Sequence, residues 1–122
     1  MLDWNEYQKQ LQTTIAEIGR ISPEIVRGYR TLGDAGKSTN TLDPKIRELI
    51  AVAVAVTRQC DGCIAVHTDA ALKNGASREE VTEALGVAIA VNAGAALIYS
   101  SRALDAFSSK QAAKDSGGAS GT

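Results

Sequence analysis

The sequence predicts an all-α fold, a bundle of five or six helices that assembles into an oligomer. Apolar residues recur at helical spacing in several segments, and helix start and stop signals separate these segments. The chain is 44 % hydrophobic but only 4 % aromatic, and much of the apolar content is alanine. Small side chains allow helices to approach closely but each buries little area, so we expect extensive helix contacts, including contacts with other subunits.

The first helix is predicted over residues 3–20, because apolar side chains recur there at three- and four-residue steps. They are Trp4, Tyr7, Leu11, Ile15 and Ile18. Ser22 and Pro23 end this helix and start the second, with serine as N-cap and proline at the first helical position. Residues 33–40 are rich in glycine and small polar residues, which predicts a loop.

Asp43 and Pro44 signal the start of a third helix over residues 45–57. After Glu48 no polar residue occurs for eight positions. We therefore expect this helix to be buried on every side, either at the centre of a bundle or beneath a second subunit.

A fourth helix is predicted over residues 61–74, with Gly75 in the position that follows the C-cap. Ser77 and Glu80 then form a capping box that starts the last helical stretch, which continues to Phe107. Gly86, Asn92 and Gly94 weaken this stretch, so we predict a break near residues 91–93.

One domain is expected over residues 1–113, since 122 residues suffice for a single core. The glycine- and serine-rich end, residues 114–122, has no apolar pattern and is expected to be a disordered tail.

Charge and composition argue against two classes of partner. The net charge is −1, with 13 basic and 14 acidic side chains and no long run of like charge, so we expect neither nucleic acid nor a membrane as partner. The first residues lack the pattern of a signal peptide, and the longest nearly apolar stretch, residues 84–99, is short for a bilayer span. A cytoplasmic protein is predicted.

Cys60, Cys63 and His67 are the most informative residues. The chain has two cysteines and one histidine, and on a helix their offsets of three and seven residues fall within about 60° of arc. Two thiols and one imidazole on a single stripe make a potential redox site.

Four interpretations of this stripe remain open. A structural disulfide would close a loop of about four residues and contribute only about 2 kcal/mol. Zinc could bind the two thiols and the imidazole, with Glu48 or Asp61 as a fourth ligand, but a second Cys/His pair is missing. The thiols and the imidazole could instead pack in the core. The fourth interpretation is a redox-active pair.

The redox interpretation has the strongest physical basis. A helix N-terminus stabilises thiolate, and cysteines three residues apart can form a disulfide without a large backbone movement. His67 can transfer protons, whereas the carboxylate of Asp61 opposes ionisation of a neighbouring thiol and could serve in the first-turn cap. In an ideal antiparallel hairpin Glu48 lies level with about residue 70, one turn beyond His67, so contact between them requires a favourable helix crossing.

From residue 42 to residue 107 the chain resembles the AhpD-like alkylhydroperoxidases of the carboxymuconolactone decarboxylase family. The shared pattern is a glutamate, eleven residues, Cys-x-x-Cys, three residues and a histidine, which here are Glu48, Cys60, Cys63 and His67. Residues 71–75 and 77–83 are also similar to the family. One departure is Gly62, where the family often has tyrosine, which affects the shape of the pocket above the sulfur.

The resemblance implies an all-helical fold and a peroxide-reducing dithiol. By analogy, Cys63 attacks the peroxide and becomes a sulfenic acid, and Cys60 resolves it as a disulfide. His67 and Glu48 would relay the proton, and an external thiol would reduce the disulfide. The family forms trimers or hexamers, which agrees with the helix expected to be buried all round.

The prediction is therefore a cytoplasmic, oligomeric thiol peroxidase or disulfide oxidoreductase that needs no prosthetic group and no metal. One alternative is a decarboxylase-like enzyme that uses His67 as acid and base. The other is a non-catalytic helical oligomer whose thiols pack or bind metal. The sequence does not identify the peroxide or the reductant.

Overall fold

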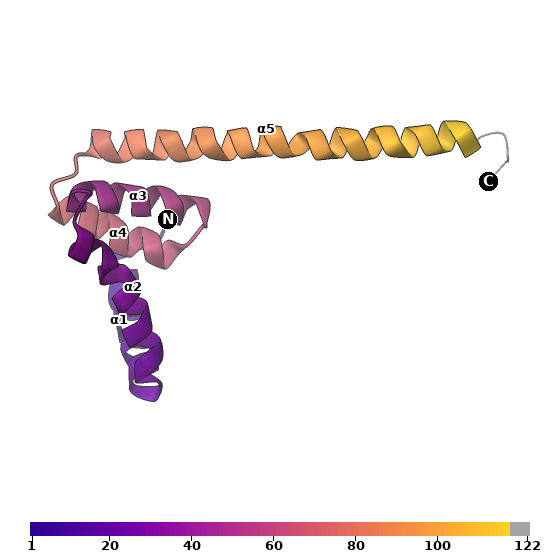
Figure 1. Cartoon of the computed structure of the whole chain (residues 1–122). Helices are drawn as coiled ribbons and strands as arrows, with labels where there is room; N and C mark the ends of the chain where they lie inside the picture. Colours follow the sequence, from indigo (N-terminus) through magenta and orange to yellow (C-terminus); the bar gives the residue numbers. More distant parts are fainter. Residues whose placement is uncertain (118–122) are drawn as a thin grey trace. The chain divides into compact units, whose positions relative to one another are not determined.

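The computed structural model describes residues 1–117, and this part of the chain is entirely helical apart from turns (Figure 1). Its elements are α1 (Trp4–Ile21), α2 (Pro23–Thr39), α3 (Pro44–Thr57), α4 (Asp61–Lys73) and α5 (Arg78–Gly117). The all-α prediction is confirmed.

The chain divides into two compact units, Met1–Ala88 and the remainder of α5 from Ile89 on. Within the first unit α3 lies against α4, and α1 contacts both α2 and α4. The core of this unit consists of small side chains, as the composition predicts: Val26, Val52, Ala55, Ala65, Ala71, Ala76 and Ala88.

The helix α2 continues through the segment that was expected to be a loop, and it ends only at Thr39 with Asn40 in the left-handed conformation. Arg47 of α3 explains the difference. A Cβ on Gly36 would lie 2.8 Å from Cδ of Arg47, so the glycine leaves room for the arginine beside the helix. The guanidinium donates to the side-chain oxygen of Asn40 at 3.2 Å and to the carbonyl of Leu42. A tertiary contact thus stabilises the last turns of α2.

The expectation that the third helix is buried on every side is wrong for the single chain. Val52 and Ala55 of α3 are buried, but Ile50 and Val54 are 50 % and 54 % exposed. The neighbouring helices cover only one side of α3. Burial by a second subunit remains a prediction.

The C-terminus of α4 ends as predicted, at a turn centred on Gly75, whose φ is +84°. The Gly75 N–H donates to the Leu72 carbonyl and the Ala76 N–H to the Ala71 carbonyl, which is the Schellman motif. The predicted capping box follows: the Glu80 N–H donates to Ser77 Oγ at 3.0 Å, and the Ser77 N–H donates to Glu80 Oε1 at 2.9 Å.

The helix α5 is continuous for 40 residues, so the predicted break near residues 91–93 is wrong. Single glycines cost a helix only about 1 kcal/mol each, and the alanine-rich sequence around Gly86 and Gly94 tolerates them. Residues 114–117 of the expected tail are also helical, and the rest of that tail lies outside the described residues.

By length and composition alone α5 could cross a membrane, and only 6 % of its most apolar stretch is buried within the chain.

Candidate active site

The turn between α3 and α4 fixes the position of Cys60. The Gln59 N–H donates to the Val56 carbonyl and the Cys60 N–H to the Ala55 carbonyl, which forms a second Schellman motif. Here a glutamine, with φ +53°, occupies the left-handed position that usually holds glycine. Cys60 completes the end of α3 and directly becomes the N-cap of α4.

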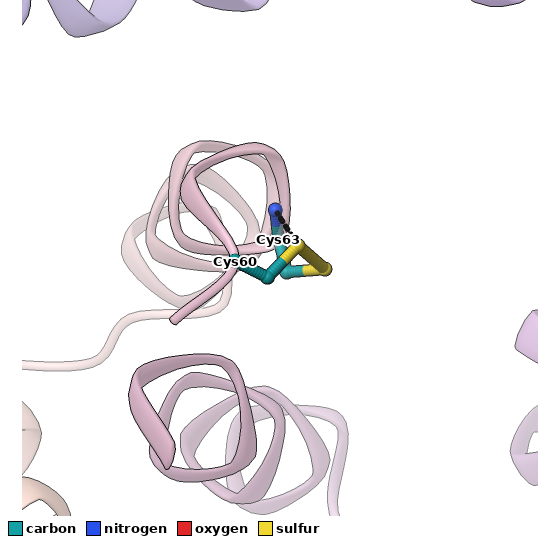
Figure 2. Close-up of a disulfide and its surroundings, with 2 residues drawn as sticks. All are labelled: Cys60 and Cys63. Carbon is teal, nitrogen blue, oxygen red and sulfur yellow. Dashed lines mark hydrogen bonds between the residues drawn. A yellow bond between two sulfur atoms is a disulfide. The ribbon is translucent and has the colours of Figure 1, made fainter. Parts of the chain in front are cut away.

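The sulfur of Cys60 is the capping group of α4. The backbone N–H of Cys63 donates to Cys60 Sγ at 3.2 Å, as the dashed line in Figure 2 shows. The two cysteines form a disulfide, with their Cα atoms 5.2 Å apart. Asp61 lies in the first turn, but the cap hydrogen bond is made by Cys60 and not by this carboxylate. The Cys60 N-cap and Cys63 in the first turn therefore both lie at the positive end of the helix dipole, where a thiolate is stabilised.

His67 and Glu48 meet across the α3–α4 pair. The Nδ1 atom of His67 lies 2.7 Å from Oε2 of Glu48, and the two side chains are 30 % and 24 % exposed. The one-turn offset of an ideal hairpin does not keep them apart, because α3 and α4 lie close enough for the side chains to span it. Since a carboxylate can only accept, Nδ1 carries the shared hydrogen, which leaves Nε2 of a neutral ring free to accept a proton.

A cavity of about 420 Å³ is lined in part by the cysteine turn. Its α4 side is formed by Cys60, Gly62, Cys63, Val66 and His67. The other walls come from α1 and α2, namely Leu11, Gln12, Ile15, Ala16, Tyr29 and Arg30. Both cysteines and the histidine thus line one cavity with mainly apolar walls, whose size is typical of small-molecule sites.

Gly62, which departs from the family pattern, lies beneath α1. A Cβ at this position would be 2.9 Å from Leu11 Cδ2 and 3.8 Å from the hydroxyl oxygen of Tyr7. A side chain of α1 therefore fills the space into which a residue at position 62 would extend. The glycine permits α1 to cover the cysteine turn.

A metal site is not evident in this region. Among residues 1–117 no group of three or more histidine, cysteine, aspartate or glutamate side chains is arranged to hold an ion. The zinc interpretation, with Asp61 or Glu48 as fourth ligand, gains no geometric support from these residues.

A comparison with models of protein families shows which family the chain belongs to. Residues 23–106 match the model of the carboxymuconolactone decarboxylase family. The chain belongs to this family. The match begins at the start of α2 and covers the whole α3–α4 pair, so the resemblance deduced from the cysteine motif is confirmed.

Three further comparisons each cover at least four fifths of this chain. An uncharacterized protein of Haemophilus influenzae is 48 % identical over 90 % of this chain and 97 % of its own length. An uncharacterized protein of Cupriavidus necator is 32 % identical over 80 % of this chain and 87 % of its own. The crystal structure of a family protein from Legionella pneumophila aligns with a TM-score of 0.69 and 38 % identity, over 87 % of this chain and 95 % of that one.

The motif located the α3 and α4 residues of this family site, but not the walls from α1 and α2. The helical period of α1 marked Leu11 and Ile15 as apolar without indicating what they face. Arg30 carried no signal in the sequence, because an arginine on an amphipathic helix is ordinarily a solvated residue.

Proposed function

We propose that the protein is a thiol-dependent peroxidase, or more broadly a disulfide oxidoreductase, that uses Cys60 and Cys63 as its dithiol. The observation that carries the proposal is the disulfide at the N-cap of α4, in a cavity that His67 also lines. A metal or prosthetic group has no part in the proposed reaction. Membership of a family of decarboxylases and peroxidases supports an enzyme, and the cysteine pair favours the redox branch.

In the proposed cycle the reduced enzyme consumes one hydroperoxide. The Cys63 thiolate attacks the terminal peroxide oxygen, the O–O bond breaks, and the products are an alcohol and a Cys63 sulfenic acid. The Cys60 thiol then attacks that sulfur, which releases water and forms the disulfide. An external dithiol reduces the disulfide and is itself oxidised.

The pair of His67 and Glu48 supports the proton steps. With Nδ1 donating to Glu48, Nε2 is available to take the proton of the Cys63 thiol and later to return it to the leaving alkoxide. The carboxylate fixes the tautomer and stabilises the imidazolium that forms. His67 is proposed as the acid and base, and Glu48 as the group that orients it.

Serine variants of the cysteines test the dithiol. Hydroperoxide-dependent oxidation of a dithiol reductant should stop in both Cys60→Ser and Cys63→Ser. Only Cys60→Ser should still form a sulfenic acid, detectable by a dimedone adduct in mass spectrometry. If turnover survives both substitutions, the dithiol mechanism is wrong, and a decarboxylase-like use of His67 becomes the better account.

Substitutions of the relay test the proton steps. His67→Ala should slow oxidation of Cys63 by about 10²-fold or more, because a general base is lost, and should leave the helix intact. Glu48→Gln should also slow this step, because an amide that donates to Nδ1 favours the wrong tautomer. Its effect should be smaller than that of His67→Ala, because the imidazole is still present. Stopped-flow rates and thermal unfolding should be measured together. If the His67→Ala protein unfolds at a lower temperature but reacts at the wild-type rate while folded, the histidine is a core residue and not a base.

The proposal includes a homo-oligomer, a trimer or hexamer, in the cytoplasm. Large apolar side chains of α3 and α5 remain more than half exposed in the single chain, among them Val54, Val87, Ile89, Val91, Leu97, Ile98, Leu104 and Phe107. Surfaces of this kind are typical of interfaces. Sedimentation without detergent should give a defined trimer or hexamer; a protein that needs detergent to stay in solution would favour a membrane role for α5.

A further inference from the structure

The charge of Arg30 is not neutralised within the cavity. Arg30 lines the cavity from α2, and no aspartate or glutamate is among the described residues that line it. No ion pair or hydrogen bond of the Arg30 side chain occurs in the described part of the chain. The cavity is therefore lined by apolar side chains, by the cysteine pair and by one exposed arginine that no carboxylate of the described residues pairs with.

The carboxylates near Arg30 on α2 already have partners. Glu24 pairs with Arg27, and Asp34 pairs with Lys37 at 3.0 Å. Arg30 also borders the adjoining hollow between α1 and α2, where the Arg27–Glu24 and Lys37–Asp34 pairs leave Arg20 as the other excess positive charge. The local charge at this end of the cavity is thus positive, which favours an anionic ligand.

We propose that the cavity selects hydroperoxides that carry a carboxylate on an apolar body, with Arg30 binding the carboxylate. This inference rests on the proposed peroxidase function and specifies its substrate class. A guanidinium can bind a carboxylate with two parallel hydrogen bonds, which fixes the orientation of the ligand as well as its position. The apolar body would lie against side chains such as Leu11, Ile15 and Val66, with the hydroperoxide group at the cysteines.

Arg30 is a positioning residue in this scheme and takes no part in the redox chemistry. The O–O bond still breaks at Cys63, and the alcohol that leaves is the corresponding hydroxy acid. Hydrogen peroxide has neither an apolar body nor a carboxylate, so its reduction should not depend on Arg30. The same holds for a hydroperoxide whose carboxylate is esterified.

Steady-state kinetics with matched substrates tests the proposal. A fatty-acid hydroperoxide below its micellar concentration, its methyl ester and hydrogen peroxide should be compared in wild type, Arg30→Gln and Arg27→Gln. Arg30→Gln should raise KM for the acid about tenfold, equivalent to about 1.4 kcal/mol, and leave the other two substrates unchanged. Arg27→Gln, on the same helix and facing Glu24, should leave all three unchanged. Equal effects on acid and ester, or no effect on the acid, would overturn it.

A binding measurement separates this inference from the peroxidase function. The hydroxy acid should be titrated calorimetrically into the oxidised protein, where no turnover is needed. The wild type should bind it about tenfold more tightly than Arg30→Gln does, and more tightly than its methyl ester. Acid binding that depends on Arg30 without any peroxidase activity would reject the function alone. Peroxidase activity with equal binding of acid and ester would reject the role of Arg30 alone.

Discussion

The two ends of α4 have the same architecture and different chemistry. Each is a Schellman motif followed directly by a helix N-cap. At the C-terminal end the left-handed residue is Gly75, and the next helix is capped by Ser77. At the N-terminal end the left-handed residue is Gln59, and the cap is the sulfur of Cys60.

The difference agrees with the proposal that the cysteine end of α4 serves a reaction, whereas the glycine end serves folding. Glycine and serine are the residues that favour such a turn and cap, whereas a left-handed residue with a side chain costs about 1–2 kcal/mol. Glu80 adds to the stability of the C-terminal end of α4, since it closes the capping box and pairs with Lys45 at 2.8 Å. The cysteine end lacks these features and instead places a disulfide in the cavity that His67 also lines. Such departures from local rules are expected at functional sites.

The largest expected effect comes from substitutions of Cys60, which separate its role in the redox reaction from its role as the N-cap of α4. Under reducing conditions Cys60→Ser should abolish turnover but unfold at the same urea concentration as wild type or a higher one, because serine is a good N-cap. Cys60→Ala should lose activity and also about 1 kcal/mol of stability. Ser77→Ala is the matched control: it should lose a similar free energy of unfolding and keep its activity. If Cys60→Ser unfolded as easily as Cys60→Ala, the cap would not be important.

The next largest effects are expected from substitutions of the two left-handed residues, Gly75 and Gln59. Gly75→Ala should destabilise the protein by about 1–2 kcal/mol, because alanine is strained at positive φ. Gln59→Gly should stabilise it by up to about 1 kcal/mol for the opposite reason. Urea unfolding of both variants gives the two changes in the free energy of unfolding. A stabilising Gly75→Ala, or a destabilising Gln59→Gly, would contradict the comparison.

The smallest expected effect is on the pH dependence of the stability that Glu80 contributes at the C-terminal end of α4. The hydrogen bond from Lys45, and then that from the Ser77 N–H, lower the pKa of Glu80 below its ordinary value of 4.5. The stability that this carboxylate contributes is therefore present above about pH 4.5 and is lost as pH falls through the lowered pKa. Glu80→Gln should lower the urea midpoint at pH 6 and flatten its decline in acid. An unchanged acid decline would show that another group causes it.

Local signals predicted most of the fold correctly. Gly75, the Ser77–Glu80 capping box and the Asp43–Pro44 helix start act within a few residues, so the sequence shows them directly. One error arose where a distant residue decides, because the end of α2 depends on Arg47. The break predicted in α5 was wrong for a local reason, because the alanine-rich sequence tolerates Gly86 and Gly94. The left-handed Gln59 carries no glycine signal.

The candidate site shows the same division. The offsets of Cys60, Cys63 and His67 placed these residues on one side of α4, and the structure puts all three at one cavity. The contact of Glu48 with His67 depends on how α3 crosses α4, which residue spacing does not specify. The walls supplied by α1 and α2 arise from helix docking and were not predictable from the sequence.

The most direct test is a single-turnover titration of the reduced protein with an organic hydroperoxide. The account predicts that one equivalent of hydroperoxide consumes both thiols, yields one equivalent of alcohol and forms the Cys60–Cys63 disulfide, far faster than in the unfolded chain. Thiols that are consumed no faster in the folded protein than in the unfolded chain would contradict it.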